Sequence, residues 1–157
     1  MSLPPQREEV EILLVEDNPA DVRLAKEALR EGEIPSNLSC VSNGVEALAF
    51  LRQEGDFATA PRPDIILLDL NLPQIDGFAV LTEIKDDPDL RTIPVVVLTT
   101  SSNPDDILRA YELHASFYIK KPSDLDEFVN AMHSFDGFCL TVAQLPPRPS
   151  TVNHDSE

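Results

Sequence analysis

The sequence predicts an open α/β fold, a doubly wound parallel sheet with helices on both faces. Short apolar segments alternate five times with segments whose apolar residues recur at helical spacing. The links between them are short, which implies right-handed crossovers between parallel strands. Several apolar segments end in an acid, a hydroxyl or a lysine, at the strand ends where such sheets bind ligands. A chain of 157 residues suffices for one domain with some tail.

The most strongly predicted strand is the central one, over residues 65–68. Four consecutive apolar residues stand between Pro63-Asp64 and Pro73, as in a strand that is buried on both faces. Asp69 follows directly and is predicted at the carboxyl end of this strand. We expect the other elements to support this aspartate.

The first βα unit also delivers acids to a strand end. Residues 1–9 are polar and contain prolines, which predicts a flexible N-terminal arm. The strand over residues 12–15 then ends in Glu16-Asp17. Asn18-Pro19 is typical of a helix N-cap followed by proline at the first helical position, and Gly32 closes the helix.

The second unit is weaker and leads into the central strand. A short strand is predicted over residues 37–41. Asn43, with Glu46 three residues later, resembles a capping box at the start of the second helix. Residues 55–63 are predicted to form a loop without catalytic residues, and residues 72–77 form a turn by their chemistry.

The third helix and the fourth unit follow the same plan. Pro88 bars continuation of the third helix, and the next strand, over residues 95–98, ends at Thr99. Asn103-Pro104 repeats the cap-and-proline start of a helix. The apolar positions of this fourth helix are Ile107, Leu108, Tyr111 and Leu113.

The fifth unit closes the domain. Residues 116–122 are predicted as a short strand that ends in lysine and proline, and Ser123 caps a fifth helix. A helical extension is predicted over residues 136–145 and a disordered tail over residues 146–157. Five units in about 120 residues suit a flavodoxin-like sheet with strand order 2-1-3-4-5, because a closed eightfold barrel needs about twice that length.

Composition excludes several classes of partner. The formal net charge of −16 argues against binding to nucleic acid or to an anionic membrane, because phosphates repel the chain. The apolar runs are too short to span a bilayer, and the N-terminus lacks the features of a signal peptide, which predicts a cytoplasmic protein. The two cysteines, Cys40 and Cys139, are interpreted as reduced, structural residues.

Three acids are predicted to meet at one edge of the sheet. Strands 1 and 3 are neighbours in this strand order, so Glu16, Asp17 and Asp69 converge. Like charges about 4 Å apart repel by about 4 kcal/mol at an effective dielectric near 20, unless a cation binds. Oxygen ligands favour a hard cation such as Mg²⁺, which shares its site with a phosphate.

Strands 4 and 5 bring the hydroxyl of Thr99 and the ammonium of Lys121 to the same edge. Three acids, a hydroxyl and a lysine around a metal describe a site for a transferable phosphoryl group. Asp69 can serve as the nucleophile and form an acyl phosphate, while Lys121 and Mg²⁺ offset the developing charge.

Together these residues resemble the receiver domain of two-component response regulators over residues 10–135. Each motif is weak alone, but the set, in order and at strand ends, is very specific. The matching positions are Glu16-Asp17, Asp69, Pro73 with Asp76-Gly77, Thr99, and Lys121-Pro122. Glu16 departs from the commoner aspartate and lengthens one acid arm.

The resemblance implies that Asp69 accepts a phosphoryl group from a phosphohistidine of a sensor histidine kinase. It implies that Glu16, Asp17, Asp69 and the backbone carbonyl of Asn71 bind Mg²⁺. Lys121, rather than Lys120, bonds the phosphoryl group because it directly precedes proline, in a peptide bond that is usually cis. Thr99, rather than Thr100, moves to the phosphoryl group, and the side chain of Tyr118 follows it.

A narrower resemblance points to the stand-alone receivers of phytochrome-type histidine kinases. It rests on residues 18–21, residues 70–73 and residues 99–102, together with the predicted helical extension. This subgroup implies homodimers through the face formed by the fourth helix, the fifth strand and the fifth helix. No output domain fits in the residues after the receiver, so the output is expected to be a protein contact or onward phosphotransfer.

Two other functions compete with a phosphorylation-switched module. An Mg²⁺-dependent phosphohydrolase usually has a second acid two residues after the nucleophile, and Asn71 at that position argues against it. A degenerate receiver that binds partners without phosphate is disfavoured by the presence of Thr99 and Lys121. We therefore expect no enzymatic activity beyond the protein's own phosphorylation and dephosphorylation.

Overall fold

The computed structural model describes residues 9–31, 35–100 and 103–120. Most of the predicted N-terminal arm lies outside these residues. So do Lys121, the Lys121–Pro122 peptide bond, the predicted fifth helix, its extension and the tail. Among the residues that the structure describes, no helix combines the length and the apolar character needed to cross a membrane.

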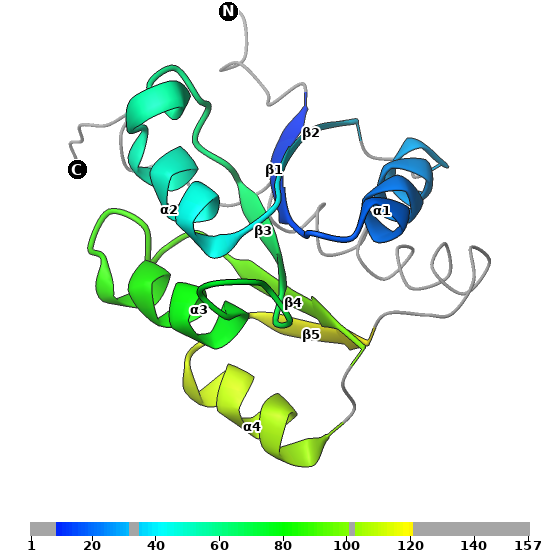
Figure 1. Cartoon of the computed structure of the whole chain (residues 1–157), viewed down its shortest axis with the longest axis vertical. Coiled ribbons are helices and arrows are strands. Elements are labelled where there is room, and N and C mark those ends of the chain that lie inside the picture. The colour runs from blue at the N-terminus through cyan, green and yellow to red at the C-terminus, as the bar shows by residue number, and fades with distance from the viewer. Residues whose placement is uncertain (1–8, 32–34, 101–102, 121–157) are drawn as a thin grey trace, which may run out of the picture.

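A five-stranded parallel sheet forms the centre of the molecule (Figure 1). The strand order is β2-β1-β3-β4-β5, which confirms the predicted order 2-1-3-4-5. The strands are β1 (Val10–Val15), β2 (Ser36–Val41), β3 (Ile65–Asp69), β4 (Val95–Thr99) and β5 (Phe117–Lys120).

Helices cover both faces of this sheet (Figure 1). They are α1 (Pro19–Glu31), α2 (Gly44–Arg52), α3 (Gly77–Asp86) and α4 (Pro104–Glu112), and a short 3-10 helix, η1 (Gly55–Phe57), lies in the predicted loop. Helix α1 packs on one face, while α2, α3 and α4 contribute to the core on the other. Successive side chains of the central strands point alternately into these two cores, as a doubly wound sheet requires.

Strand β3 is buried along its whole length. Its side chains from Ile65 to Leu68 are fully buried, and Asp69 is 3% exposed. Complete burial of each such aliphatic side chain contributes about 1.5–3 kcal/mol. The strand therefore provides a rigid base for the aspartate at its end.

Helix starts follow the predicted capping chemistry, with one difference. The Asn43 side chain accepts a hydrogen bond from the Glu46 amide (2.8 Å), and Asn103 accepts one from the Asp105 amide (2.9 Å). The Glu46 carboxylate, however, accepts from the Ser42 amide (2.9 Å), one residue before the cap. In a capping box the Glu46 side chain would bond the amide of the N-cap residue, Asn43. Here it bonds the amide of the residue before the N-cap instead.

Helix α4 departs in part from its predicted apolar face, although Leu113, directly after the helix, packs against the core as predicted. Ala110 is its buried residue, whereas Leu108 is 58% exposed and Tyr111 is 45% exposed. Helical spacing alone does not distinguish these two faces.

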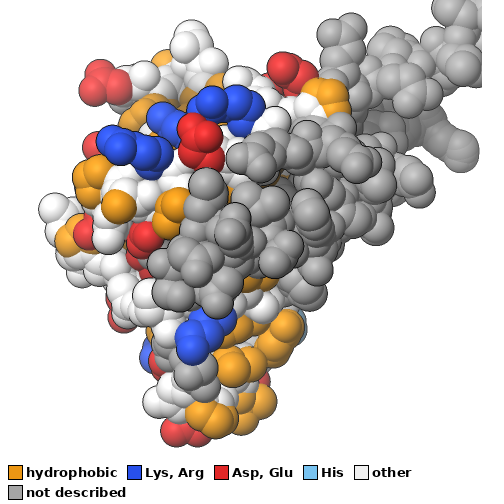
Figure 2. Space-filling view, turned by 90° about the vertical axis from the view of Figure 1, so that its right-hand side faces the viewer, with side chains coloured by type: hydrophobic (Ala, Val, Ile, Leu, Met, Phe, Trp, Pro, Cys, Tyr) orange, Lys and Arg blue, Asp and Glu red, His pale blue; other side chains and the backbone are white. Residues whose placement is uncertain are grey.

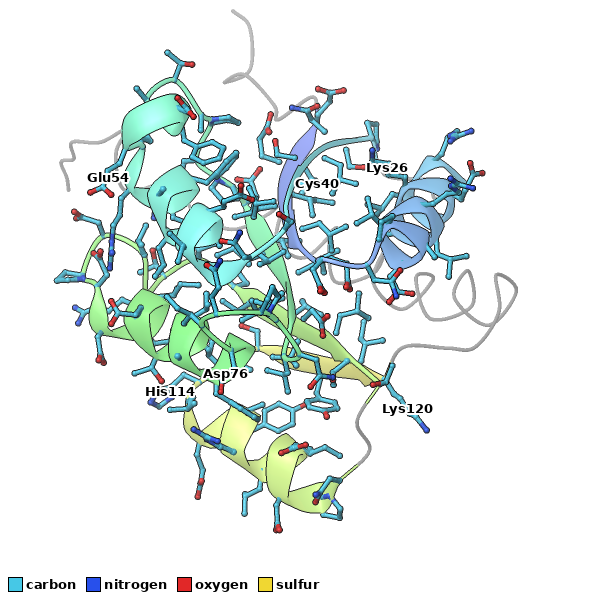
Figure 3. The ribbon with its side chains drawn as sticks, viewed as in Figure 1. Lys26, Cys40, Glu54, Asp76, His114 and Lys120 are labelled. Carbon is cyan, nitrogen blue, oxygen red and sulfur yellow. The ribbon has the colours of Figure 1, made fainter. Side chains whose placement is uncertain are left out.

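Cys40 is a free cysteine on the edge strand β2, within the described part of the chain. Burial of its thiol raises the pKa above the ordinary value, and the positive charge of Lys26 on α1 opposes this shift in part (Figure 3). A raised pKa lowers the thiolate fraction at neutral pH, which fits the interpretation of Cys40 as a reduced thiol.

Candidate functional site

The three predicted acids meet at the carboxyl ends of β1 and β3. The two strands are paired in parallel, with Val15 opposite Leu68, so the residues that follow them are neighbours. Carboxylate oxygens of Glu16, Asp17 and Asp69 all lie within 4.8 Å of one another. Glu16 and Asp69 are each 3% exposed, while Asp17 is exposed. Two ligands of the cluster are therefore anchored in the protein and the third faces solvent.

Local hydrogen bonds orient the two buried carboxylates. Glu16 Oε2 accepts from the Asn18 amide (3.1 Å), in the turn that leads into α1. Asp69 Oδ1 accepts from the Asn71 amide (3.0 Å), two residues further along the chain. Each acid is thus held by the loop that begins at its own strand end.

This cluster suits a hard divalent cation. All three donors are carboxylates, which Mg²⁺, Mn²⁺ and Ca²⁺ prefer over soft metals. Three negative charges this close repel one another, and a bound cation relieves that repulsion. The donor set and its spacing therefore fit a divalent cation.

Gly77 sets the distance between α3 and the strand end that carries Asp69. A Cβ atom at this position would lie 2.5 Å from the Asp69 carbonyl oxygen and 2.5 Å from the Leu70 Cα. The Gly77 amide also donates to the Leu70 carbonyl (3.0 Å). Asp76 begins the helix by accepting from the Ala79 amide (2.9 Å; Figure 3). The Asp76-Gly77 pair is therefore a helix cap followed by a close backbone contact, a role that the sequence analysis did not recognise.

Thr99 lies beside this cluster at the end of β4. It is fully buried, and β4 pairs with β3 so that Leu98 stands opposite Asp69. Asn71 Nδ2 donates to Thr99 Oγ1 (3.4 Å). The sequence analysis assigned only the backbone of Asn71.

Strand β5 carries Tyr118 and Lys120, and Lys121 follows it. Tyr118 on β5 is half-buried and packs against the larger core cluster. Lys120 is exposed at the end of β5, as expected of a solvated charge (Figure 3). Lys121 lies outside the described residues.

A cleft of about 590 Å³ lies at this edge of the sheet, and Asp17 is the member of the acid cluster that lines it. Asp17, Asn71 and Thr99 line it at the strand ends, and Phe78 and Arg109 line it from α3 and α4. The guanidinium carbon of Arg109 lies 4.2 Å from the centre of the Phe78 ring. Neither residue could be predicted for the site, because nothing local in the sequence shows that α3 and α4 meet there.

A parallel sheet of this order, with an acid cluster and a buried threonine at its carboxyl edge, defines a receiver-type phosphorylation domain. The family model for the response regulator receiver domain matches residues 12–133, and the chain belongs to this family.

Two relatives are similar to this chain along most of its length. The chain is 48% identical over 135 residues to the response regulator Rcp1 of Synechocystis, covering 86% of this chain and 92% of the relative. It is 40% identical over 130 residues to the probable methanogenesis regulatory protein FilR2 of Methanothrix harundinacea, covering 82% and 83%.

Two solved structures are similar along most of the chain. One is the phosphorylated cyanobacterial phytochrome response regulator RcpA, with 51% identity and a TM-score of 0.82, covering 88% of this chain and 99% of that one. The other is the Mn²⁺-bound form of Rcp1, with 46% identity and a TM-score of 0.80, covering 91% and 100%.

Proposed function

We propose that this protein is a phosphorylation-switched signalling module in which Asp69 accepts a phosphoryl group from a sensor histidine kinase. The observation that carries the proposal is the geometry at the end of β3. Asp69 lies with Glu16 and Asp17 in one cluster, beside the buried hydroxyl of Thr99, and both Asp17 and Thr99 line an open cleft. Membership of the receiver family supports the same reaction.

The chemistry is a single phosphoryl transfer. A carboxylate oxygen of Asp69 attacks the phosphorus, the bond from phosphorus to the donor nitrogen breaks, and an acyl phosphate remains on Asp69. Glu16, Asp17, Asp69 and the backbone carbonyl of Asn71 would hold Mg²⁺, which offsets the charge on the phosphoryl oxygens when bound. Thr99 would leave its contact with Asn71 and hydrogen-bond the attached phosphoryl group, with Tyr118 following. Lys121 would bond another phosphoryl oxygen.

Metal removal tests this function. Wild-type protein given acetyl phosphate and Mg²⁺ is expected to gain one phosphoryl group, detected by intact-protein mass spectrometry and mapped to Asp69 by peptide analysis. With excess EDTA the labelling rate is expected to fall by about two orders of magnitude or more, because three clustered carboxylates repel an anionic donor. Labelling at another residue, or at the same rate without metal, would refute the proposal.

The kinase partner is proposed from the relatives. RcpA is described as a cyanobacterial phytochrome response regulator, and the chain has 51% sequence identity to it. We therefore assign a phytochrome-type kinase as the donor in a cytoplasmic pathway. Faster phosphotransfer from a phytochrome-type kinase than from an unrelated histidine kinase supports the assignment. Equal rates would count against it.

The proposed module turns over only its own phosphate. Asn71 occupies the position where a phosphohydrolase carries its second acid, and its side chain is engaged with Thr99. Steady release of phosphate from an ester substrate would revive the hydrolase alternative.

The boundaries of the receiver domain are proposed at residues 10–135.

The exposed apolar face of α4 supports homodimerisation. Leu108 and Tyr111 are one helical turn apart and both stand on the surface. Figure 2 shows hydrophobic side chains gathered at the lower end of the molecule, where α4 lies. We propose that this face, with β5 and the predicted fifth helix, forms the dimer and transmits the signal.

Leu108→Glu is expected to weaken dimerisation about tenfold or more, because a charge replaces a buried contact at the interface. Sedimentation velocity with and without acetyl phosphate measures this. Val45→Glu is the matched control, since Val45 is 51% exposed but lies on α2. A wild type that stays monomeric in both conditions, or equal effects of the two variants, would contradict the proposed interface.

A further inference from the structure

We propose that Arg109 recognises the anionic phosphodonor at the wall of the cleft and thereby sets donor preference. The inference rests on the proposed phosphorylation of Asp69. It assigns Arg109 to donor binding and leaves the transfer step to the residues at the strand ends.

Arg109 is held in place by a second helix. It comes from α4, and the Phe78 ring beneath its guanidinium comes from the first turn of α3. A cation over an aromatic face is attracted by the ring, and a stacked guanidinium keeps its N–H groups in its own plane, where an anion can bind them. Phe78 directly follows Gly77, whose amide donates to the carbonyl of Leu70, the residue after Asp69. The position of Arg109 is thus tied to the phosphoacceptor strand.

The charge balance of the cleft makes this cation significant. Among the described residues that line the cleft, Asp17, Asp76 and Asp106 are acidic and Arg109 is the basic residue. The whole chain carries a net charge of −16. A phosphodonor is itself an anion, so it meets repulsion on approach unless a cation lines its path. A charged group at the wall of a cleft acts on approach more strongly than the same group on a flat surface.

The location of Arg109 also limits its role. Thr99 lines the same cleft and is fully buried, whereas Arg109 lines it from α4 over the Phe78 ring and is exposed to solvent. The structure therefore assigns Arg109 to the donor side of the reacting phosphorus. On this basis, replacement of Arg109 slows binding of the donor and leaves the rate of later phosphate loss from Asp69 unchanged.

Two small donors of different charge test this assignment. Acetyl phosphate carries more negative charge at neutral pH than phosphoramidate. Arg109→Gln is expected to lower the second-order rate constant for acetyl phosphate by about three- to tenfold, with a smaller loss for phosphoramidate. Its rate is also expected to depend less on salt, while the dephosphorylation rate stays within about twofold of wild type. Arg109→Lys, which keeps the charge, is expected to retain most of the rate.

Arg91→Gln is the matched control, because Arg91 is exposed in the link between α3 and β4 and does not line this cleft. Equal effects of the Arg109 and Arg91 variants would overturn the inference. So would an Arg109→Gln defect that is the same for both donors and extends to dephosphorylation, since that indicates a structural role. If wild-type protein is labelled by neither donor, the proposed function itself fails, and Arg109 has no donor to recognise.

Discussion

Asp69→Asn is expected to abolish covalent phosphorylation and, in metal-free buffer, to stabilise the fold. Asparagine keeps an oxygen that can accept from the Asn71 amide, so the local geometry survives. It removes the nucleophilic carboxylate and one of three clustered charges. Two charges about 4 Å apart repel by about 4 kcal/mol at an effective dielectric near 20. Because Asp17 is exposed and screened, we expect a net gain of about 1–2 kcal/mol.

Urea unfolding with and without Mg²⁺ measures this second effect. Wild-type protein is expected to gain about 2.7 kcal/mol at a Mg²⁺ concentration one hundred times its Kd, and the variant is expected to gain much less at the same concentration. Asp56→Asn makes the same charge change at an exposed residue of η1 and is expected to alter stability by about 0.5 kcal/mol or less. A metal-free Asp69→Asn protein less stable than wild type would argue against repulsion within the cluster.

Gly77→Ala is expected to cost about 3 kcal/mol or more of unfolding free energy and to slow phosphorylation of Asp69. The added Cβ would lie 2.5 Å from two backbone atoms, at Asp69 and Leu70, which cannot rotate away as a side chain can. Overpacking typically costs about 1–3 kcal/mol, and displacement of the helix start also weakens the Gly77–Leu70 hydrogen bond. The same displacement shifts Asp69 relative to Glu16 and Asp17.

Urea unfolding and the acetyl phosphate labelling rate together test this expectation. Gly55→Asn is the control, because Gly55 has open space around it and a φ of +58° that asparagine tolerates. We expect it to change stability by about 0.5 kcal/mol or less. If Gly77→Ala matches the control in both stability and labelling, then α3 does not position the strand end.

The acid cluster could be predicted from the sequence because its causes are local. Each acid follows a run of apolar residues, and the order of βα units determines which strand ends are neighbours. The strand order and the convergence of Glu16, Asp17 and Asp69 are both confirmed. The same reasoning places Thr99 at the next strand end, where the structure finds it buried beside them.

Contacts between elements were decided only in the tertiary structure. The close approach of Gly77 to Asp69, the bond from Asn71 to Thr99 and the stacking of Arg109 on Phe78 each join segments that no local pattern pairs. Which side of α4 faces solvent likewise depends on the rotation of the helix about its axis, which buries Ala110. Hydrophobic periodicity predicts that a helix forms. Its position in the chain determines which strand it follows. Its rotation and its distance from its neighbours depend on side chains that are far apart in the sequence, so they are determined by packing.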